Sequence, residues 1–185
     1  AGVDIGRKKD LTVLWVVEQL GDVFYTRHVE VMEKMRKSAQ EAILWPWFEI
    51  CDRVCIDSTG LGIGWADDAQ DKFGPHRVEG VNFSGPVKEA LAYPLRGAME
   101  DRMVRIPEDP KIRADLRKVQ KTTTAAGNIR FVADGDDSTK VNGHADRFWA
   151  LALALHAGSS PSAPIEYESG GPRDSSQPLG DFIHG

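Results

Sequence analysis

The chain has 185 residues, of which 41% are hydrophobic and 28% are charged. This length suffices for one well-buried domain, and the composition excludes a disordered or fibrous protein. No apolar run approaches the roughly 20 residues of a membrane-spanning helix, so we expect no membrane partner. The net charge of −5 argues against a passive nucleic-acid coat, which is normally basic, but not against an enzyme that holds metal ions with carboxylates.

The first part of the chain predicts a three-stranded antiparallel meander followed by a helix. Apolar and β-branched runs predict strands at 3–6, 11–17 and 23–31, with a turn at Gly21 and Asp22. Ser38, with Glu41 three residues later, forms a capping-box pattern that predicts a helix over 39–50. Pro46 predicts a kink within that helix.

Strands and helices alternate from that point to residue 106. The patterns predict strands at 53–57, 78–83 and 103–106 and helices at 62–73 and 86–101, which requires parallel strands and right-handed crossovers. A basic helix over 111–118, a hairpin of strands 122–124 and 129–132, and an apolar helix over 144–156 capped by Asn142 complete the domain. The predicted fold class is α/β, a mixed sheet of five or more strands with helices on both faces and an added hairpin.

The composition changes after Gly158, where Ser, Pro, Gly and acidic residues replace apolar ones. We therefore predict a domain over 1–158 and a flexible tail over 159–185. The chain starts without Met and enters a strand almost at once, so we interpret it as a fragment of a longer polypeptide without a secretory leader. Cys51 and Cys55 make a poor zinc site, and we expect them to be reduced, structural thiols of a cytoplasmic protein.

Three aspartates are the candidates for chemistry. Asp4 is predicted to sit within the first strand, Asp57 at the end of the fourth, and Asp146 in the first turn of the last helix. In a mixed sheet the first strand is central and the fourth lies beside it, so the last helix can pack across both and gather the acids. Clustered carboxylates repel one another unless a divalent cation compensates them, and hard oxygen ligands select Mg²⁺ or Mn²⁺. Two such ions can activate water and stabilise the leaving oxygen in phosphodiester hydrolysis.

Each aspartate also has an ordinary structural interpretation. Asp4 fits a turn, Asp57 can bond to the turn that follows it at 58–60, and Asp146 can interact with the helix dipole. The conjunction of the three positions favours a metal site. The chain has no G-x-S-x-G motif, no Cys–His pair in a suitable context and no phosphate-binding glycine loop.

Three segments form an ordered set along the chain. The first is Val-Asp-Ile-Gly at 3–6 with Asp-Leu-Thr-Val at 10–13, the second is Val-Cys-Ile-Asp-Ser-Thr-Gly-Leu-Gly at 54–62, and the third is Gly-His-Ala-Asp at 143–146 with the Ala-rich helix after it. In their order and spacing they resemble the nuclease motifs of phage large terminase subunits. The resemblance spans roughly 2–157 and looks closest to the Mu-like prophage branch. It implies an RNase H-like endonuclease that cuts phage DNA during packaging with two metal ions, using Asp4, Asp57 and Asp146 as catalytic and metal-binding residues.

The resemblance also implies partners and a location. Such a domain usually follows an N-terminal packaging ATPase, which this chain lacks because nothing in it resembles a phosphate-binding loop. Double-stranded DNA is the implied substrate, the portal and the small terminase subunit are further expected partners, and the host cytoplasm during phage assembly is the expected location. Some relatives use an additional acid or histidine in the third motif, which makes His144 a further candidate metal ligand. Asp10, Asp136 and Asp137 are weaker candidates.

Basic residues near the predicted site are candidates for holding DNA phosphates without reading sequence. Arg7, Lys8 and Lys9 follow Asp4 directly. The others lie on the basic helix, on the hairpin or after it, and are Arg113, Arg117, Lys118, Lys121, Arg130 and Lys140. A solvated surface is the alternative interpretation for any one of them. We expect the hairpin over 122–132 to lie over the groove and limit access to it.

Other functions remain open on the sequence. Another RNase H-like nuclease, such as a junction resolvase or a transposase core, shares the carboxylate site, and a catalytically inactive module serves only for docking. Mn²⁺-dependent plasmid cleavage separates an enzyme from a docking module, and preference for four-way junctions favours a resolvase. An actin-like ATPase is disfavoured because that fold needs a second phosphate loop and a much longer chain.

Overall fold

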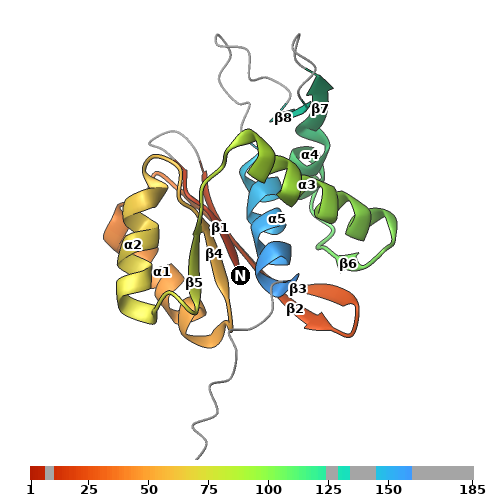
Figure 1. Ribbon diagram of the computed structural model, residues 1–185. Helices are drawn as coiled ribbons and strands as arrows, with labels where there is room; N and C mark the ends of the chain where they lie inside the picture. The colour runs from red at the N-terminus through yellow and green to blue at the C-terminus, as the bar shows by residue number, and fades with distance from the viewer. Residues whose placement is uncertain (7–10, 124–128, 134–144, 160–185) are drawn as a thin grey trace, which may run out of the picture.

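The computed structural model describes residues 1–6, 11–123, 129–133 and 145–159, and it contains a six-stranded mixed sheet between two layers of helices (Figure 1). The strands, in the order β5-β4-β1-β2-β3-β6, are β1 (Gly2–Asp4), β2 (Leu11–Leu20), β3 (Val23–Glu33), β4 (Val54–Asp57), β5 (Val78–Val81) and β6 (Val104–Arg105). The helices are α1 (Lys37–Ile50), α2 (Gly62–Phe73), α3 (Gly85–Glu100), α4 (Pro110–Lys118) and α5 (Asp146–Ser159). The predicted α/β class with helices on both faces is confirmed.

The antiparallel meander forms as the sequence predicts. β1 pairs with β2 and β2 pairs with β3, both antiparallel. Gly21 makes the turn between β2 and β3 at a φ of +60°, a conformation that costs little without a side chain. A register shift lies between Val16 and Val17. The central place of β1, which the proposed site needs, follows from this pairing and from the parallel pairing of β1 with β4.

The parallel strands do not all add to the same edge of the sheet. β4 and β5 extend it beyond β1, whereas β6 pairs in parallel with β3 at the opposite edge. The chain segment from β5 through α3 to β6 therefore crosses the whole face that α5 covers. The sequence predicted β6 as a strand but could not predict its edge, because two residues of pairing carry little pattern of their own.

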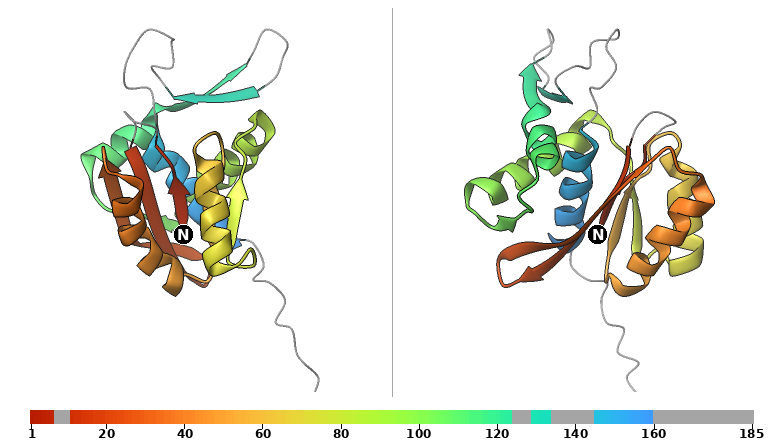
Figure 2. Two further views of the ribbon diagram at one scale, coloured as in Figure 1. Left: turned by 90° about the vertical axis from the view of Figure 1, so that its left-hand side faces the viewer. Right: turned by 180° about the vertical axis from the view of Figure 1, so that it is seen from behind.

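Two apolar cores lie on the two faces of the sheet, because alternate residues of a strand point to opposite faces. Val3, Leu14 and Val16 pack with Leu44 and Phe48 of α1 on one face. The other core is built around α5, which packs on β1, β2 and β4 and is covered by α3 and α4. Figure 2 shows α1 and α2 on one side of the sheet and α5 on the other. Residues 148–155 of α5 are all buried, which explains why this helix is apolar around its whole circumference.

A second, two-stranded sheet consists of β7 (Val119–Thr123) and β8 (Ile129–Ala133), which pair antiparallel directly after α4. It is the predicted hairpin, with longer strands than the sequence indicated. The hairpin contacts α3 through Tyr93 and Phe131, whose ring centroids lie 5.1 Å apart in an edge-to-face arrangement. In the described residues, no helix combines the length and the apolar character needed to cross a membrane.

Several predicted boundaries were wrong. β1 ends at Asp4, so this aspartate terminates the strand instead of lying in its middle. α1 starts at Lys37 after Arg36 and has no side-chain cap, so Ser38 lies inside the first turn and is not the N-cap. Pro46 lies inside this helix, as predicted. β5 ends at Val81, level with the end of its neighbour β4 at Asp57, and β6 has only two residues, which pair with Phe24 and Tyr25 of β3. Asn142 lies outside the described residues.

Candidate metal centre

Asp4 and Asp57 end two neighbouring parallel strands. β1 and β4 pair in parallel with Gly2 opposite Cys55 and Val3 opposite Ile56, so the next step along both strands reaches Asp4 and Asp57. Neighbouring strands lie about 4.8 Å apart. Asp4 is buried, with 8% of its surface exposed, and Asp57 is half-buried. The sheet therefore brings two carboxylates to the same edge, where the carboxyl ends of its parallel strands meet.

Asp146 reaches the same edge from α5. It is the first residue of the helix and is as buried as Asp4, at 8% exposure. Its Oδ2 accepts a hydrogen bond of 3.1 Å from the backbone N–H of Leu11, the first residue of β2. Because β2 runs antiparallel to β1, the start of β2 lies at the edge where β1 ends. The last helix and the first strand thus present carboxylates at one place although 141 residues separate them in sequence.

The close approach of α5 to β1 depends on Gly2. A Cβ at this position would lie 2.2 Å from both the carbonyl oxygen of Ala150 and the backbone nitrogen of Ala154. Asp4 is two residues beyond Gly2 along the strand, and Asp146 is one helical turn before Ala150. Strand and helix cover about 6 Å in these steps, so this packing sets how near the two carboxylates come.

A turn after β4 orients Asp57. Its Oδ1 accepts a 2.9 Å hydrogen bond from the N–H of Thr59, and the Oγ1 of Thr59 accepts one of 3.0 Å from the N–H of Phe83. Burial raises the pKa of Asp57, and this effect outweighs the hydrogen bonds to Thr59 and the positive charge of Lys88, which lower it. A Cβ at Gly62 would lie 1.8 Å from the carbonyl oxygen of Asp57, so α2 can begin here only with glycine.

The donors at this edge fit a hard divalent cation. All three offer carboxylate oxygens, and two of the three side chains are almost fully buried. Burial and mutual repulsion disfavour several charged carboxylates in one place unless cations compensate them. Oxygen ligands of this kind suit Mg²⁺ and Mn²⁺ better than softer metals. The arrangement can therefore hold divalent metal ions.

Another cluster of possible metal ligands lies two residues back along β4. Among the described residues, one group of three side chains has all its ligand atoms within 4.8 Å of one another, and it consists of Cys55, Glu79 and His156, not the three aspartates. Arg53 forms an ion pair with Glu79, and His156 Nε2 lies 3.5 Å from the other carboxylate oxygen. Burial raises the pKa of the Cys55 thiol to about 12, so it is protonated at neutral pH. Because Arg53 already supplies the positive charge, we interpret this cluster as an ion-pair network. Both cysteines are free, as expected.

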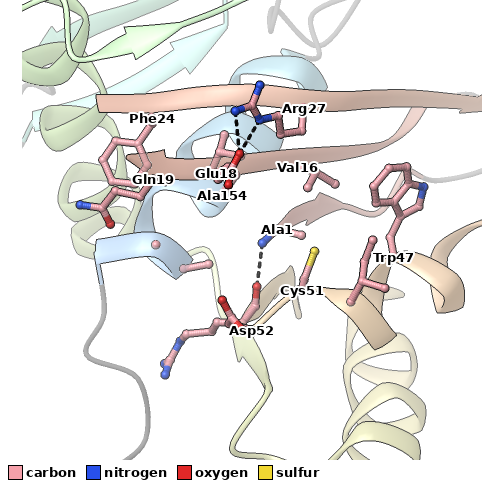
Figure 3. A pocket seen from close by; sticks show the side chains of 15 residues that line it. Ala1, Val16, Glu18, Gln19, Phe24, Arg27, Trp47, Cys51, Asp52 and Ala154 are labelled. Carbon is pink, nitrogen blue, oxygen red and sulfur yellow. Dashed lines mark hydrogen bonds and ion pairs between the residues drawn. The ribbon is translucent and has the colours of Figure 1, made fainter. Parts of the chain in front are cut away.

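A pocket of about 670 Å³ opens at the opposite end of the sheet. Its lining includes Ala1 at the start of β1, Glu18 near the end of β2, and Gly158 near the end of α5. The amino group of Ala1, which is labelled in Figure 3, donates to the carbonyl oxygen of Arg53 at 2.6 Å. Since the aspartates lie at the other ends of these same elements, this pocket is separate from the candidate metal centre.

The predicted DNA-binding residues fall into two groups. Arg113, Arg117 and Lys121 are exposed near the second sheet, whereas Lys118 Nζ lies 2.9 Å from the carboxylate of Asp115. Five others contribute no described side chain: Arg7, Lys8, Lys9 and Lys140 lie outside the described residues, and for Arg130 the backbone alone is described. His144, Asp10, Asp136 and Asp137 also lie outside them.

Sequence reasoning missed three residues around the site. Asp115 is only 4% exposed and binds Arg147 of α5 at 2.7 Å as well as Lys118, which fixes α4 against the start of α5. Lys88, on α3, lies close enough to lower the pKa of Asp57. Thr59 holds the turn after Asp57. Thr59 lies inside the second motif, two residues after Asp57, and this position could have indicated its role, but the other two depend on contacts between distant segments.

Comparison with known proteins gives a consistent result. Residues 1–157 match the profile of the terminase RNaseH-like domain family. The nuclease of the large terminase from thermophilic phage G20c, solved with bound magnesium, is 28% identical, with a TM-score of 0.68 over 84% of this chain and 78% of that one. The same nuclease has also been solved with cobalt, at 28% identity and a TM-score of 0.68 over 84% and 78% of the two chains. The large terminase nuclease domain of Thermus phage P74-26 is 27% identical, with a TM-score of 0.64 over 83% and 76%. No curated protein matched.

Proposed function

Because this chain belongs to the terminase RNaseH-like domain family, we propose that it is the metal-dependent endonuclease domain of a phage large terminase subunit and cleaves double-stranded DNA during genome packaging. The observation that carries the proposal is the register that places Asp4 beside Asp57, with Asp146 bonded to the start of the neighbouring strand. The RNase H-like fold of the matching nucleases supports it.

We propose Asp4, Asp57 and Asp146 as the metal-binding and catalytic residues, with Mg²⁺ or Mn²⁺ as the ions and His144 as a further candidate ligand. The G20c nuclease has been solved with magnesium, cobalt and zinc, which supports a site for divalent cations. We propose two ions about 4 Å apart, the arrangement that phosphodiester hydrolysis by carboxylate-bound metals uses. When bound, such ions supply an activated water and compensate the charge on the leaving oxygen.

The chain's own residues prepare this chemistry by holding the carboxylates in place. The N–H of Leu11 donates to Oδ2 of Asp146, and the N–H of Thr59 donates to Oδ1 of Asp57, which restrains both carboxylates. The buried Asp115–Arg147 ion pair holds the first turn of α5. The proposed phosphate contacts on either side of the cleaved bond come from Arg7, Lys8, Lys9, Arg117, Lys121, Arg130 and Lys140, and Lys118 is a weaker candidate because it is paired with Asp115. The hairpin of β7 and β8 covers the groove.

In the full-length protein this domain follows a packaging ATPase, and it meets DNA in the host cytoplasm, where the portal and the small subunit are its further partners. The proposed nuclease domain comprises residues 1–158; of the predicted tail over 159–185, Ser159 is the last residue of α5, and residues 160–185 lie outside the described residues. Membership of the terminase RNaseH-like domain family supports these proposals.

Cleavage of plasmid DNA with Mg²⁺ or Mn²⁺ tests the function. Replacing Asp57 by Asn removes the charge that holds the cation, so the cleavage rate falls by about 10²-fold or more. Because burial raises the pKa of Asp57, its charged form destabilises the metal-free fold above the carboxyl's ordinary pKa of 3.8. Asp57→Asn therefore raises the melting temperature at neutral pH, and the gain disappears as the pH falls below that value.

Asp67→Asn is the matched control, because Asp67 is an exposed acid on α2. It leaves both cleavage and the melting temperature unchanged. Equal cleavage by the parent and Asp57→Asn removes Asp57 from the site. A parent that does not cut under any divalent cation contradicts the enzymatic function and leaves a docking module, and a preference for four-way junctions favours a resolvase.

A further inference from the structure

Two aromatic side chains connect the Asp57 turn to the start of α5. Phe83 follows β5 and donates its backbone N–H to Thr59 in the turn after Asp57. Trp149 lies on α5, three residues after Asp146. The ring centroids of Phe83 and Trp149 are 5.3 Å apart. This aromatic pair therefore lies between the segments that carry two of the three aspartates.

The ammonium group of Lys88 lies over this pair. Its Nζ is 5.2 Å from the Trp149 ring centroid and 5.8 Å from that of Phe83. The Lys88 backbone N–H donates to the carbonyl of Ser84 at 2.9 Å, so Lys88 belongs to the first turn of α3 and its stem starts from a fixed point. Contact of a cation with aromatic faces restrains it by about 0.5–2 kcal/mol. Lys88 is thus held in a defined position beside the carboxylates.

Lys88 forms no ion pair with another of the described residues. Within the described part of the chain, no carboxylate lies within 4 Å of its Nζ among the ion pairs found, in contrast to Lys118, which is 2.9 Å from Asp115. Its field nevertheless reaches Asp57, whose pKa it lowers against the larger opposing effect of burial. Aromatic faces do not neutralise a cation, so this ammonium group keeps its capacity to bind an anion.

We propose that Lys88 binds a phosphate of the DNA backbone next to the carboxylate edge. Metal ions bound by the aspartates leave no carboxylate for Lys88 to neutralise, and the anion that then comes within reach is a phosphate oxygen of the substrate. The aromatic pair positions the ammonium for this contact in advance, which lowers the entropy lost on binding. This inference rests on the proposed nuclease function.

The test measures the affinity of the Asp57→Asn chain for a linear DNA duplex, with catalysis blocked, at several salt concentrations. In that background Lys88→Met keeps the stem over the rings but removes the charge. The slope of log affinity against log salt falls by about 0.9, the value for one phosphate contact. The affinity of the Asp57→Asn chain divided by that of the chain with both substitutions is therefore about fourfold larger at about 50 mM salt than at about 200 mM salt. Lys88→Arg restores the slope, because the guanidinium also stacks on aromatic rings and binds phosphate.

Lys72→Met is the matched control, because Lys72 also lies over two aromatic rings, those of Trp45 and Phe73, but on the opposite face of the sheet. It leaves the slope unchanged. A Lys88→Met variant that melts at a lower temperature but keeps the parental slope shows a structural role and overturns the proposal. If the unmodified chain cuts DNA but Lys88→Met leaves the salt slope of the Asp57→Asn chain unchanged, this inference alone is refuted. If the unmodified chain neither cuts nor binds DNA, the proposed function is refuted.

Discussion

Glu79 is the central residue of the ion-pair network that it forms with Arg53 and His156. Arg53 and His156 both contact its carboxylate, and Arg53 Nε is buried without a hydrogen-bond partner. Burial alone would raise the pKa of Glu79, but the hydrogen bonds and charges of Arg53 and His156 outweigh it and leave the pKa below its ordinary value of 4.5. A lowered carboxyl pKa stabilises the fold above that ordinary value, and the stabilisation is lost as the pH falls through the lowered value.

Glu79→Gln therefore reduces the free energy of unfolding by roughly 0.5–1 kcal/mol at pH 7, measured by urea denaturation. The difference from the parent shrinks as the pH falls below 4.5, because the parent carboxyl then becomes neutral too. Glu89→Gln on α3 is the control, since no ion pair of Glu89 occurs among the described residues, and it shows no such pH dependence. A difference between Glu79→Gln and the parent that is the same at pH 3 and pH 7 contradicts the ion-pair interpretation.

The sequence indicated which single residues matter wherever one segment carried the whole signal. Asp57 ends a buried strand and precedes a turn, and both features are local. Lys88 had no such signal, because its role depends on Phe83 and Trp149, which lie on segments 66 residues apart. Asp115 was hidden in a basic helix, and its burial between Lys118 and Arg147 depends on how α4 meets α5.

At the scale of elements, the contact between β1 and α5 fixes the geometry of the site. Gly2→Ala places a methyl group 2.2 Å from two backbone atoms of α5, and a helix backbone cannot yield as a flexible side chain does. We expect a loss of about 1–3 kcal/mol in unfolding free energy and a lower affinity for Mn²⁺, measured by calorimetry, although no ligand has changed.

Gly64→Ala is the control for this prediction. Gly64 lies in α2, and a Cβ there meets nothing within 4 Å, so alanine stabilises the helix by up to about 1 kcal/mol. If Gly2→Ala melts at the parental temperature and binds Mn²⁺ as tightly, then the contact between β1 and α5 does not set the spacing of Asp4 and Asp146.

Element types were predictable from periodicity, whereas their ends and their partners were less so. α2 was predicted to its exact bounds because a glycine-rich turn precedes it and Gly74 follows it. α1 was misplaced by two residues because the capping-box pattern of Ser38 and Glu41 does not form, and the helix starts after Arg36 without a side-chain cap. The edge that β6 joins is decided by the crossing of α3 over α5, which no local pattern records.

At the scale of the whole molecule, the proposed function requires a negatively charged protein to bind negatively charged DNA. The net charge of the chain is −5, but the basic residues around the second sheet provide positive charge locally. These residues are not equivalent. Lys121 is exposed with its Nζ 5.5 Å from the Tyr93 ring centroid. Lys118 is tied to Asp115.

We therefore expect Lys121→Ala to reduce the slope of DNA affinity against salt by up to about one, equally for all DNA sequences. Lys118→Ala leaves Asp115 with Arg147 alone and lowers the melting temperature more than it changes the slope. Titrations at several salt concentrations, with Ca²⁺ to block cleavage, measure both effects. A larger slope change for Lys118→Ala than for Lys121→Ala contradicts this prediction. It would show that Lys118 contacts phosphate and that DNA displaces its ion pair with Asp115.

The position of α5 between the sheet and α3 has a consequence for the order of events in the cell. This helix is the last element of the described domain, yet it fills the centre of one core and carries Asp146. A ribosome releases Asp4 and Asp57 long before α5, and until the helix docks, the face that it covers has no apolar partner. The nascent chain therefore cannot assemble the three aspartates. We therefore expect no metal-dependent cleavage from a chain in which α5 has not yet docked on the sheet.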